Sequence, residues 1–413
     1  MDNVATASLQ DHYDRVRRMT LELCSTLAPE DTVVQSMPDV SPTKWHLAHV
    51  TWFFERFVLE AFASDYARFD DRYDFLFNSY YYSVGQMHAR PRRGLLSRPV
   101  LADVIAYRAH VDNAMHELLQ TRDDQKLAER ITLGLNHEQQ HQELMLTDIK
   151  HVFSCSPLLP AVDGGLNIPA RGSATDYLYK EGAAGIHSVG AKGLGFCFDN
   201  ETPRHDALLH AHRIGARLVT NAEFREFVLD GGYTESQLWL SDGWTVVNER
   251  GWSRPLYWGE DLETEFTLGG QREIDAHAPV CHVSYYEADA FARWAGARLP
   301  TEFEWETAAK NEKVQGNFVE TRYWQPAPAS GAGQFFGDVW EWTSSSYAPY
   351  PGFVPLAGSL GEYNGKFMCN QMTVRGGSCV SATDHVRATY RSFFYPDARW
   401  QFLGIRLAKD GAD

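Results

Sequence analysis

The sequence has little that would tie it to a membrane or to nucleic acid. No stretch approaches the ~18 consecutive apolar residues that a membrane helix needs. Positive charge is scarce, since 38 lysines and arginines stand against 54 acidic residues and leave a net charge of −16. An acidic chain of this kind is repelled by nucleic acid phosphates and by anionic lipid surfaces. We therefore expect no nucleic acid and no membrane among its partners.

Paired cysteines and a targeting segment are also missing. The six cysteines are scattered and form no C-x-x-C pair, which argues against a disulfide framework and against a cysteine zinc site. Residues 1–14 are polar and acidic, without the apolar core of a secretory signal or the basic character of a transit peptide. The sequence thus predicts a cytoplasmic protein.

The first part of the chain has the periodicity of a helical bundle. Apolar residues recur at helical spacing in four segments, at residues 8–27, 42–63, 99–121 and 123–153. The second segment has a helix-start signal, with proline at position 42 after a polar run. A long irregular connection, residues 70–98, separates the second and third segments. Residues 1–155 are therefore predicted to form a four-helix bundle, whose interior is a common place for metal sites.

The rest of the chain has a different composition. Residues 156–185 are rich in proline and glycine and read as a connector. Only Trp45 and Trp52 of the 12 tryptophans precede residue 239, so residues 186–413 are rich in aromatics as well as glycine. One clear helix is expected at residues 285–295. The predicted fold class is α+β, with an irregular, aromatic-packed second domain.

The run N-H-E-Q-Q-H-Q-E at residues 136–143 carries the most specific chemistry. His137 and His141 stand four residues apart, so on a helix they share one face and could bind one metal ion. They could equally be two packed helix histidines. The letters also match the H-E-x-x-H signature of zinc proteases, with Glu138 as general base, but no third ligand pattern follows His141. A third histidine from the second helix fits a bundle better.

Two histidines of the second helix are candidates for that third ligand. His49 is preferred over His46 because the small Ala48 lies beside it. His46 is then expected to contribute packing only.

Several stretches resemble one family over nearly the whole chain. The runs S-P-T-K-W-H-L-A-H-V-T-W-F-F-E (residues 41–55) and H-E-Q-Q-H-Q-E-L (137–144) resemble the DinB-like domain of the EgtB-type sulfoxide synthases, type II, which are iron enzymes of ergothioneine biosynthesis. The second half resembles their formylglycine-generating-enzyme-like domain, with a C-type-lectin-like α+β fold. The matching runs there are A-R-L-V-T-N-A-E-F (216–224), A-R-L-P-T-E-F-E-W-E (297–306), G-D-V-W-E-W-T (337–343), R-G-G-S (375–378) and F-L-G-I-R-L-A (402–408).

The resemblance implies that His49, His137 and His141 bind a non-haem iron(II). Three neutral imidazoles leave the full charge on the metal and keep coordination positions open for a thiolate and dioxygen. A three-histidine site therefore attracts an anionic sulfur ligand more strongly than a site in which a carboxylate already offsets part of the metal charge.

The irregular connection matches the same family. Tyr80 and Tyr81, in N-S-Y-Y-Y, would lie by the iron, where a phenol can donate a proton to reduced oxygen. Arg90 and Arg93, in H-A-R-P-R-R-G, would hold the carboxylate of the thiol substrate, because guanidinium forks bind carboxylates in a bidentate way.

The second substrate implied by the resemblance is hercynine, the betaine of histidine. Gln140 would hydrogen-bond near its imidazole, and Phe393 with Phe394 would face its trimethylammonium group, which aromatic rings recognise best. Ser392 stands where the family has asparagine, so the contact to the hercynine carboxylate differs here.

The expected activity is therefore iron- and O2-dependent carbon–sulfur bond formation on hercynine, with cysteine as donor and a sulfoxide as product. A selenoneine synthase, which would use a selenosugar donor on the same acceptor, is the alternative within this chemistry. A zinc metalloprotease and a non-catalytic binding protein are more distant alternatives. Formylglycine-generating chemistry is not expected, because Ser381 and Val386 occupy the positions of its cysteine pair.

Overall fold

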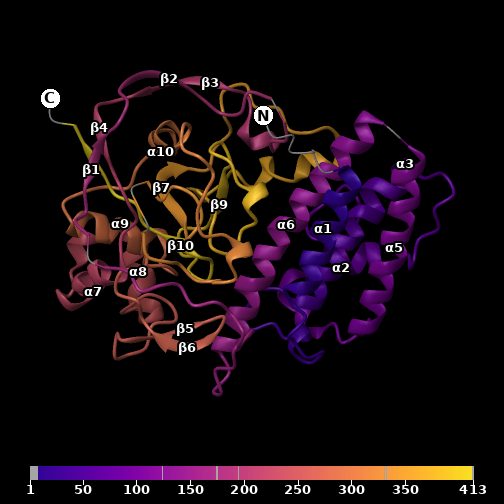
Figure 1. Ribbon diagram of the computed structural model, residues 1–413, viewed down its shortest axis with the longest axis horizontal. Coiled ribbons are helices and arrows are strands. Elements are labelled where there is room, and N and C mark those ends of the chain that lie inside the picture. Colours follow the sequence, from indigo (N-terminus) through magenta and orange to yellow (C-terminus); the bar gives the residue numbers. More distant parts are fainter. Residues whose placement is uncertain are drawn as a thin grey trace. The chain divides into compact units, whose positions relative to one another are not determined.

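The structure is a computed structural model that describes residues 8–122, 124–173, 175–193, 195–329, 331 and 333–411. The chain divides into two compact units (Figure 1). The first comprises Met1–Ser156 together with the short segment Ala357–Tyr363, and the second comprises Pro157–Leu356 and Asn364–Asp413. Helices make up the first unit, and short strands and helices alternate in the second, so the predicted α+β class is confirmed. Within the described residues, no helix has the length and apolar composition that a membrane crossing requires.

The first unit is built on four long helical segments (Figure 1). They are α1 (Leu9–Glu22), α2 (Thr43–Phe54) continued by a π-helical turn (Glu55–Leu59) and α3 (Glu60–Phe62), α5 (Leu101–Thr121) and α6 (Gln125–Ser154). The helix α2 packs against both α5 and α6, and α1 packs against α6. Shorter pieces fill the connections: 3-10 turns at Asp31–Val33, Arg90–Leu95 and Gly358–Glu362, and α4 (Tyr73–Phe77).

Every residue of α2 is buried, which makes it the central helix of the bundle. Its start lies where the sequence predicts, but Pro42 is the N-cap residue and no side chain caps the helix. Ser41, the polar residue before Pro42, contacts another helix instead: its backbone N–H donates to the carboxylate of Asp148 on α6 at 2.7 Å. The helix start is therefore tied to α6 instead of being capped locally.

The first helix is shorter than predicted. It begins with a capping box between Ser8 and Asp11, but after Glu22 the chain continues in 3-10-type turns, with Cys24 N–H bonded to the carbonyl of Leu21. Pro29 follows and cannot continue a helix, and the next turn, Asp31–Val33, packs against α2.

The second unit contains several small sheets. A four-stranded sheet has the order β10 (Leu403–Gly404), β7 (Trp340–Ser346), β8 (Met372–Arg375), β9 (Ser392–Phe394), with β10 parallel to β7 and the other pairs antiparallel. A three-stranded antiparallel sheet has the order β1 (Tyr179–Glu181), β4 (His212–Gly215), β11 (Ala408–Asp410). Two hairpins complete the strands: β2 (Gly185–Val189) with β3 (His205–Leu209), and β5 (Thr264–Thr267) with β6 (Gly270–Glu273).

The described part of the second unit also contains four helices: α7 (Asn221–Leu229), α8 (Ser241–Arg250), α9 (Tyr285–Trp294) and α10 (Glu302–Ala309). The helix α10 packs against both strands of the β2–β3 hairpin and against β4, β7 and β8. The helix expected at residues 285–295 is α9, which starts with a capping box between Ser284 and Glu287. The unit also buries charge, because Arg375 on β8 pairs with Glu302 at 2.9 Å and Glu306 at 3.0 Å on α10. Because all three side chains are buried, removing one partner of this network would leave an uncompensated charge.

Candidate metal centre

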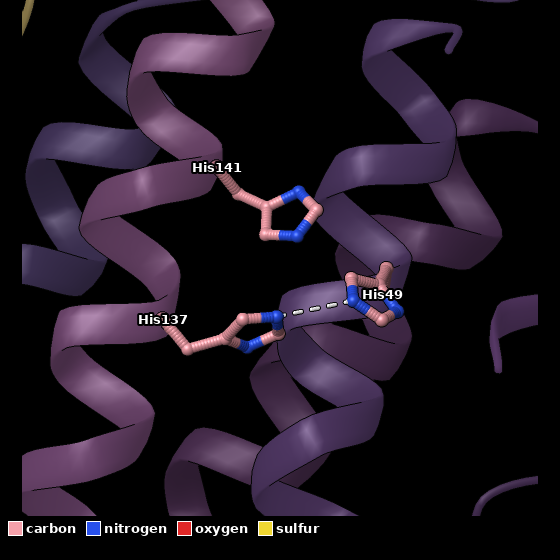
Figure 2. A group of neighbouring side chains, drawn as sticks. All are labelled: His49, His137 and His141. Atoms are coloured by element: carbon pink, nitrogen blue, oxygen red, sulfur yellow. Dashed lines mark hydrogen bonds between the residues drawn. The ribbon is translucent and has the colours of Figure 1, made fainter. Parts of the chain in front are cut away.

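Three histidines converge inside the bundle. His49 comes from α2, and His137 and His141 come from successive turns of α6, as Figure 2 shows. One ring nitrogen from each lies within 4.8 Å of the others, and all three side chains are buried. The Nε2 atoms of His49 and His137 are 3.2 Å apart. Two nitrogens at adjacent positions of one metal, each bonded at ~2.1 Å, would lie about 3 Å apart, so the spacing fits a shared ion.

The contacts of Nδ1 in His49 and His141 determine which nitrogen of each ring faces the centre. His49 Nδ1 lies 2.6 Å from the carbonyl oxygen of Phe77, and His141 Nδ1 lies 2.8 Å from Nδ1 of His46. These contacts leave the Nε2 atoms of both rings free for a metal. Nδ1 of His137 is buried and has no hydrogen-bond partner among the described residues.

All three imidazoles are held neutral. Burial lowers the pKa of His137 to about 3, and burial and the neighbouring histidines lower the pKa of His49 and of His141 well below the ordinary value. A neutral imidazole is the form that binds a metal, through the lone pair of its unprotonated ring nitrogen. The donor set is thus three neutral nitrogens that suit iron, zinc, copper or nickel.

The carboxylate next to His137 does not join this centre. Glu138 accepts hydrogen bonds from Arg17 at 2.9 Å, from Thr20 at 2.6 Å, and from Arg108. Burial alone would raise the pKa of Glu138, but the charges of Arg108 and Arg17 outweigh it and hold the pKa below its ordinary value. Both oxygens are therefore occupied on the α1 and α5 side, and the general base of the zinc-protease interpretation is absent.

Two phenols of the connecting loop lie close to the helical segment that carries His49. The Tyr80 ring lies 4.6 Å from that of Tyr81, and Tyr81 packs against Trp52 and Phe57 at 5.8 and 4.9 Å. Burial raises the pKa of both phenols, so each keeps its proton at neutral pH. These side chains are proton donors and not bases.

A third phenol was not expected from the sequence. Tyr363 ends the segment Ala357–Tyr363, which belongs to the first unit. Its ring lies 5.6 Å from His137 and 6.2 Å from Tyr80, and its hydroxyl donates to Oε1 of Gln140. Gln140 is thereby oriented one turn away from His137, on the ligand-bearing helix.

The backbone near Tyr82 anchors this segment. Glu362 accepts hydrogen bonds from the N–H groups of Tyr82 and Ser83 at 3.0 and 2.9 Å, and Ser359 Oγ accepts from Ser83 Oγ at 2.8 Å. The contacts fix Tyr363 relative to the loop that carries Tyr80.

A buried guanidinium forms a second feature of the site. Arg93 is 3% exposed and donates to Ser41 Oγ at 2.8 Å and Ser79 Oγ at 3.0 Å. Burial, with a contribution from Arg90, lowers the pKa of Arg93. Its guanidinium lies 3.3 Å from the centroid of the Trp45 ring, which also stacks on His49 at 4.6 Å. Among the described residues no carboxylate forms an ion pair with Arg93, so its charge is compensated there by hydroxyl groups and an aromatic ring.

Arg90, by contrast, is exposed, and its guanidinium donates to the carbonyl oxygen of Asp39. The two arginines predicted to act together thus lie in different environments, one buried and one at the surface of the unit.

Comparisons with known proteins agree with both units. Residues 12–151 match the DinB superfamily, and residues 181–332 and 324–411 match the sulfatase-modifying factor enzyme 1-like domain. The chain is 33% identical to the hercynine oxygenase of Mycolicibacterium smegmatis, with 98% of this chain and 100% of that one covered. It is 33% identical to the hercynine oxygenase of Mycobacterium tuberculosis, with 97% and 98% covered. The chain belongs to the hercynine oxygenase family.

About half of the chain is similar to a second group. The formylglycine-generating enzyme of Streptomyces coelicolor is 30% identical, with 53% of this chain and 85% of that one covered. Among solved structures, Treponema denticola variable protein 1 is 16% identical with a TM-score of 0.41, and the match covers 59% of this chain and all of that one. Ser381 and Val386 stand at the positions of the cysteine pair of formylglycine-generating enzymes, and both side chains are buried in this member of the hercynine oxygenase family.

The remaining residues predicted for the site lie in the second unit. Ser392, Phe393 and Phe394 form β9, which pairs with β8. Phe393 stacks on Tyr347 at 4.0 Å and lies 5.9 Å from Phe367. An aromatic cluster therefore surrounds one of the two phenylalanines that the family resemblance assigns to the betaine.

Sequence reasoning missed four residues of the centre: Trp45, His46, Asp148 and Tyr363. The expectation that His46 only packs is wrong, because both of its ring nitrogens are hydrogen-bonded, to His141 and to Asp148. Asp148 follows His141 by seven residues, so helical spacing alone could have placed it on the ligand face. Tyr363 lies in an aperiodic stretch, where no local pattern indicates a contact to α6.

Proposed function

We propose that this chain is a non-haem iron(II)- and O2-dependent oxidoreductase that joins the sulfur of a thiol to the imidazole carbon of hercynine. The balance is C–H plus H–S plus O2 giving a C–S(=O) sulfoxide and one water. Cysteine is the favoured donor, and the product would be the hercynylcysteine sulfoxide of ergothioneine biosynthesis. The buried three-histidine centre beside an anion-binding guanidinium carries the proposal, and the full-length similarity to hercynine oxygenases supports it.

His49, His137 and His141 would hold the iron through Nε2. When bound, iron(II) would supply the one-electron chemistry that lets ground-state O2 react with a thiolate, which zinc cannot supply. The three neutral imidazoles leave open positions for substrate and keep the site's charge positive. Trp45, stacked on His49, excludes water from that side.

Arg93 would bind the donor's carboxylate. Its guanidinium is bonded to two serine hydroxyls and forms no ion pair within the described part of the chain, so a carboxylate would find an unpaired charge there, and burial would strengthen the attraction. Arg90 would add long-range attraction from the surface. A carboxylate-binding site favours an amino-acid thiol over a selenosugar, which has no carboxylate, so selenoneine synthesis stays the alternative.

Proton delivery would fall to the phenols. One oxygen atom leaves as water, which requires two protons close to the centre. The thiol and the imidazole carbon release two, and a neutral phenol can pass one on without leaving a charge in the ground state. Tyr363 is a candidate donor because its ring lies 5.6 Å from that of His137, and Tyr81 and Tyr80, which packs on both Tyr81 and Tyr363, would complete the set.

Gln140 would hydrogen-bond to hercynine near its imidazole. Its Oε1 accepts from the hydroxyl of Tyr363, which fixes the orientation of the Gln140 amide on α6. Phe393 and Phe394 would meet the trimethylammonium group and Ser392 the carboxylate, as proposed from the family resemblance. We propose a cytoplasmic location, because none of the six cysteines, all of which are described, forms a disulfide and the thiol substrate must stay reduced.

The test is product formation. The metal-free protein is loaded with iron(II) without air and mixed with hercynine and either cysteine, γ-glutamylcysteine or a selenosugar, then exposed to O2. We expect mass spectrometry to detect the cysteine sulfoxide, and nothing from zinc-loaded protein or from His49→Ala. Product from the selenosugar alone would favour the selenoneine alternative. No coupled product from any donor would contradict the proposal and favour a binding protein, and casein cleavage by zinc-loaded protein would favour the protease.

A further inference from the structure

A chain of buried polar groups runs from α6 through α2 back to the metal centre. Asp148 Oδ2 lies 3.0 Å from His46 Nε2, and His46 Nδ1 lies 2.8 Å from His141 Nδ1. Exposure is 2% for His46 and 8% for His141, and Asp148 is also buried. The groups therefore meet without intervening bulk water, and each must satisfy the others.

The hydrogen atoms along this chain can be assigned. The N–H of Ser41 donates to Oδ2 of Asp148 at 2.7 Å, so that oxygen is an acceptor. His46 Nε2 faces the same oxygen and must carry a hydrogen to bond to it. A neutral imidazole carries only one, so His46 Nδ1 is an acceptor, and His141 Nδ1 must be the donor facing it. Each contact then joins one donor to one acceptor.

We propose that Asp148 and His46 are positioning residues that hold His141 as the Nδ1–H tautomer with its Nε2 lone pair directed at the metal. The inference rests on the proposed metal function of the three histidines. It extends the usual pairing of a metal-binding histidine with a carboxylate or carbonyl by one further imidazole. We refer to Asp148, His46 and His141 as the relay.

The other two ligands show what the relay adds. The Phe77 carbonyl fixes His49, whereas Nδ1 of His137 has no partner among the described residues. At His141 the ring nitrogen in the same position, Nδ1, contacts His46 Nδ1, so the relay takes the place that the carbonyl has at His49. Because His46 lies on α2 and the other two members on α6, the relay also holds together the two helices that supply the ligands.

The experiment measures zinc affinity in the full-length protein by chelator competition. His46→Leu and His46→Asn form a matched pair, because their side chains are nearly equal in size and leave the same space. Only asparagine retains an acceptor, on the atom that replaces Nδ1. We expect His46→Leu to bind zinc about 10–100-fold more weakly than wild type, the usual effect of removing such a partner, and His46→Asn to recover most of that loss.

A remote histidine–carboxylate pair is the control. His116 on α5 contacts Asp14 on α1 at 2.6 Å, away from the metal ligands, so His116→Leu should leave zinc affinity unchanged. Equal zinc affinity in wild type and His46→Leu would overturn the relay. Equal zinc affinity in wild type and His49→Ala would instead reject the metal site itself, and the relay with it.

A second readout needs no substitution. Nitrogen NMR of the wild-type histidine rings distinguishes Nδ1–H from Nε2–H. We expect His141 to carry hydrogen on Nδ1 and His46 on Nε2 in the zinc-loaded protein, and His46→Leu to broaden or shift the His141 signals while His46→Asn restores them. A zinc-loaded wild type with His141 protonated on Nε2 would contradict the proposal even if no variant folded.

Discussion

At the scale of single residues, the least expected group is Arg93, a buried cation that has no anionic partner among the residues that the structure describes. Burial removes Arg93 from water, and its guanidinium contacts two serine hydroxyls and the face of an aromatic ring. Hydroxyl dipoles and a ring quadrupole compensate a guanidinium only in part. A bound carboxylate would complete this compensation, which is why we propose Arg93 as a substrate-binding residue.

Arg93→Met should therefore weaken the thiol substrate selectively. Losing a buried charge-assisted contact costs ~2–5 kcal/mol, or about 30-fold or more in apparent KM for cysteine. Hercynine affinity should change little. Arg90→Met, which alters an exposed side chain, should change the KM for cysteine only about two- to five-fold. Steady-state kinetics with each substrate varied would check this, and equal losses for both substrates would make Arg93 structural.

The phenols give a second test at this scale. Tyr363→Phe keeps the ring beside His137 but removes the hydroxyl, so iron binding should persist while sulfoxide formation falls ~100-fold, the usual contribution of a positioned proton donor. Thiol oxidation without coupling should continue. Tyr82→Phe is the matched control, because that side chain is 74% exposed. Tyr80→Phe and Tyr81→Phe should have smaller effects. Normal product formation by the Tyr363, Tyr80 and Tyr81 variants would mean that the three phenols only pack.

At the scale of elements, α6 carries two of the three histidines and forms buried ion pairs with α1 and α5. Glu138, on a different face from the histidines, binds Arg17 of α1 and Arg108 of α5, and all three side chains are buried. One carboxylate between two guanidinium groups holds three helices together. Removing it would leave two buried cations facing each other.

We expect Glu138→Gln to destabilise the bundle by ~3–5 kcal/mol. Urea unfolding followed by helical circular dichroism would measure it. Glu129→Gln, on the same helix but exposed and bonded only to Gln125, should cost less than ~0.5 kcal/mol. A loss for Glu138→Gln no larger than for this control would mean that the arginines find other partners.

The bundle was largely predictable from the sequence, and its site was predictable in part. Helical periodicity indicates α5 and α6 to within two residues, and the spacing of His137 and His141 indicates a shared face. Contacts that join different helices have no local signal. His46 looked like a packing residue because its partner Asp148 is about a hundred residues away, and the position of Tyr363 depends on a segment that the chain reaches only after most of the second unit.

At the scale of the whole molecule, the two units can be observed separately in solution. Of the 12 tryptophans only Trp45 and Trp52 lie in the first unit, so fluorescence reports mainly on the second. Long helices are confined to the first unit, so helical circular dichroism reports mainly on it. Two unfolding transitions can thus be assigned without dissecting the chain.

The second unit should lose stability in acid through His385. Burial, with a contribution from Arg387, lowers the pKa of His385 to about 3, while the unfolded chain has a pKa of about 6.5. Below pH 6.5 the unfolded state takes up a proton that the folded state does not, so stability falls with pH. Between pH 7 and 5 wild type should lose ~2 kcal/mol more than His385→Gln. Denaturant unfolding followed by fluorescence at both pH values would measure this, and parallel profiles would contradict it.

The most direct test of the account is the iron content of single-histidine variants. After anaerobic reconstitution and removal of loose metal, wild type should hold one iron per chain by elemental analysis. His49→Ala should lose iron as completely as His137→Ala or His141→Ala, although 88 residues separate His49 from His137. The three side chains would then act as one site. Full iron occupancy in His49→Ala would contradict the three-histidine centre.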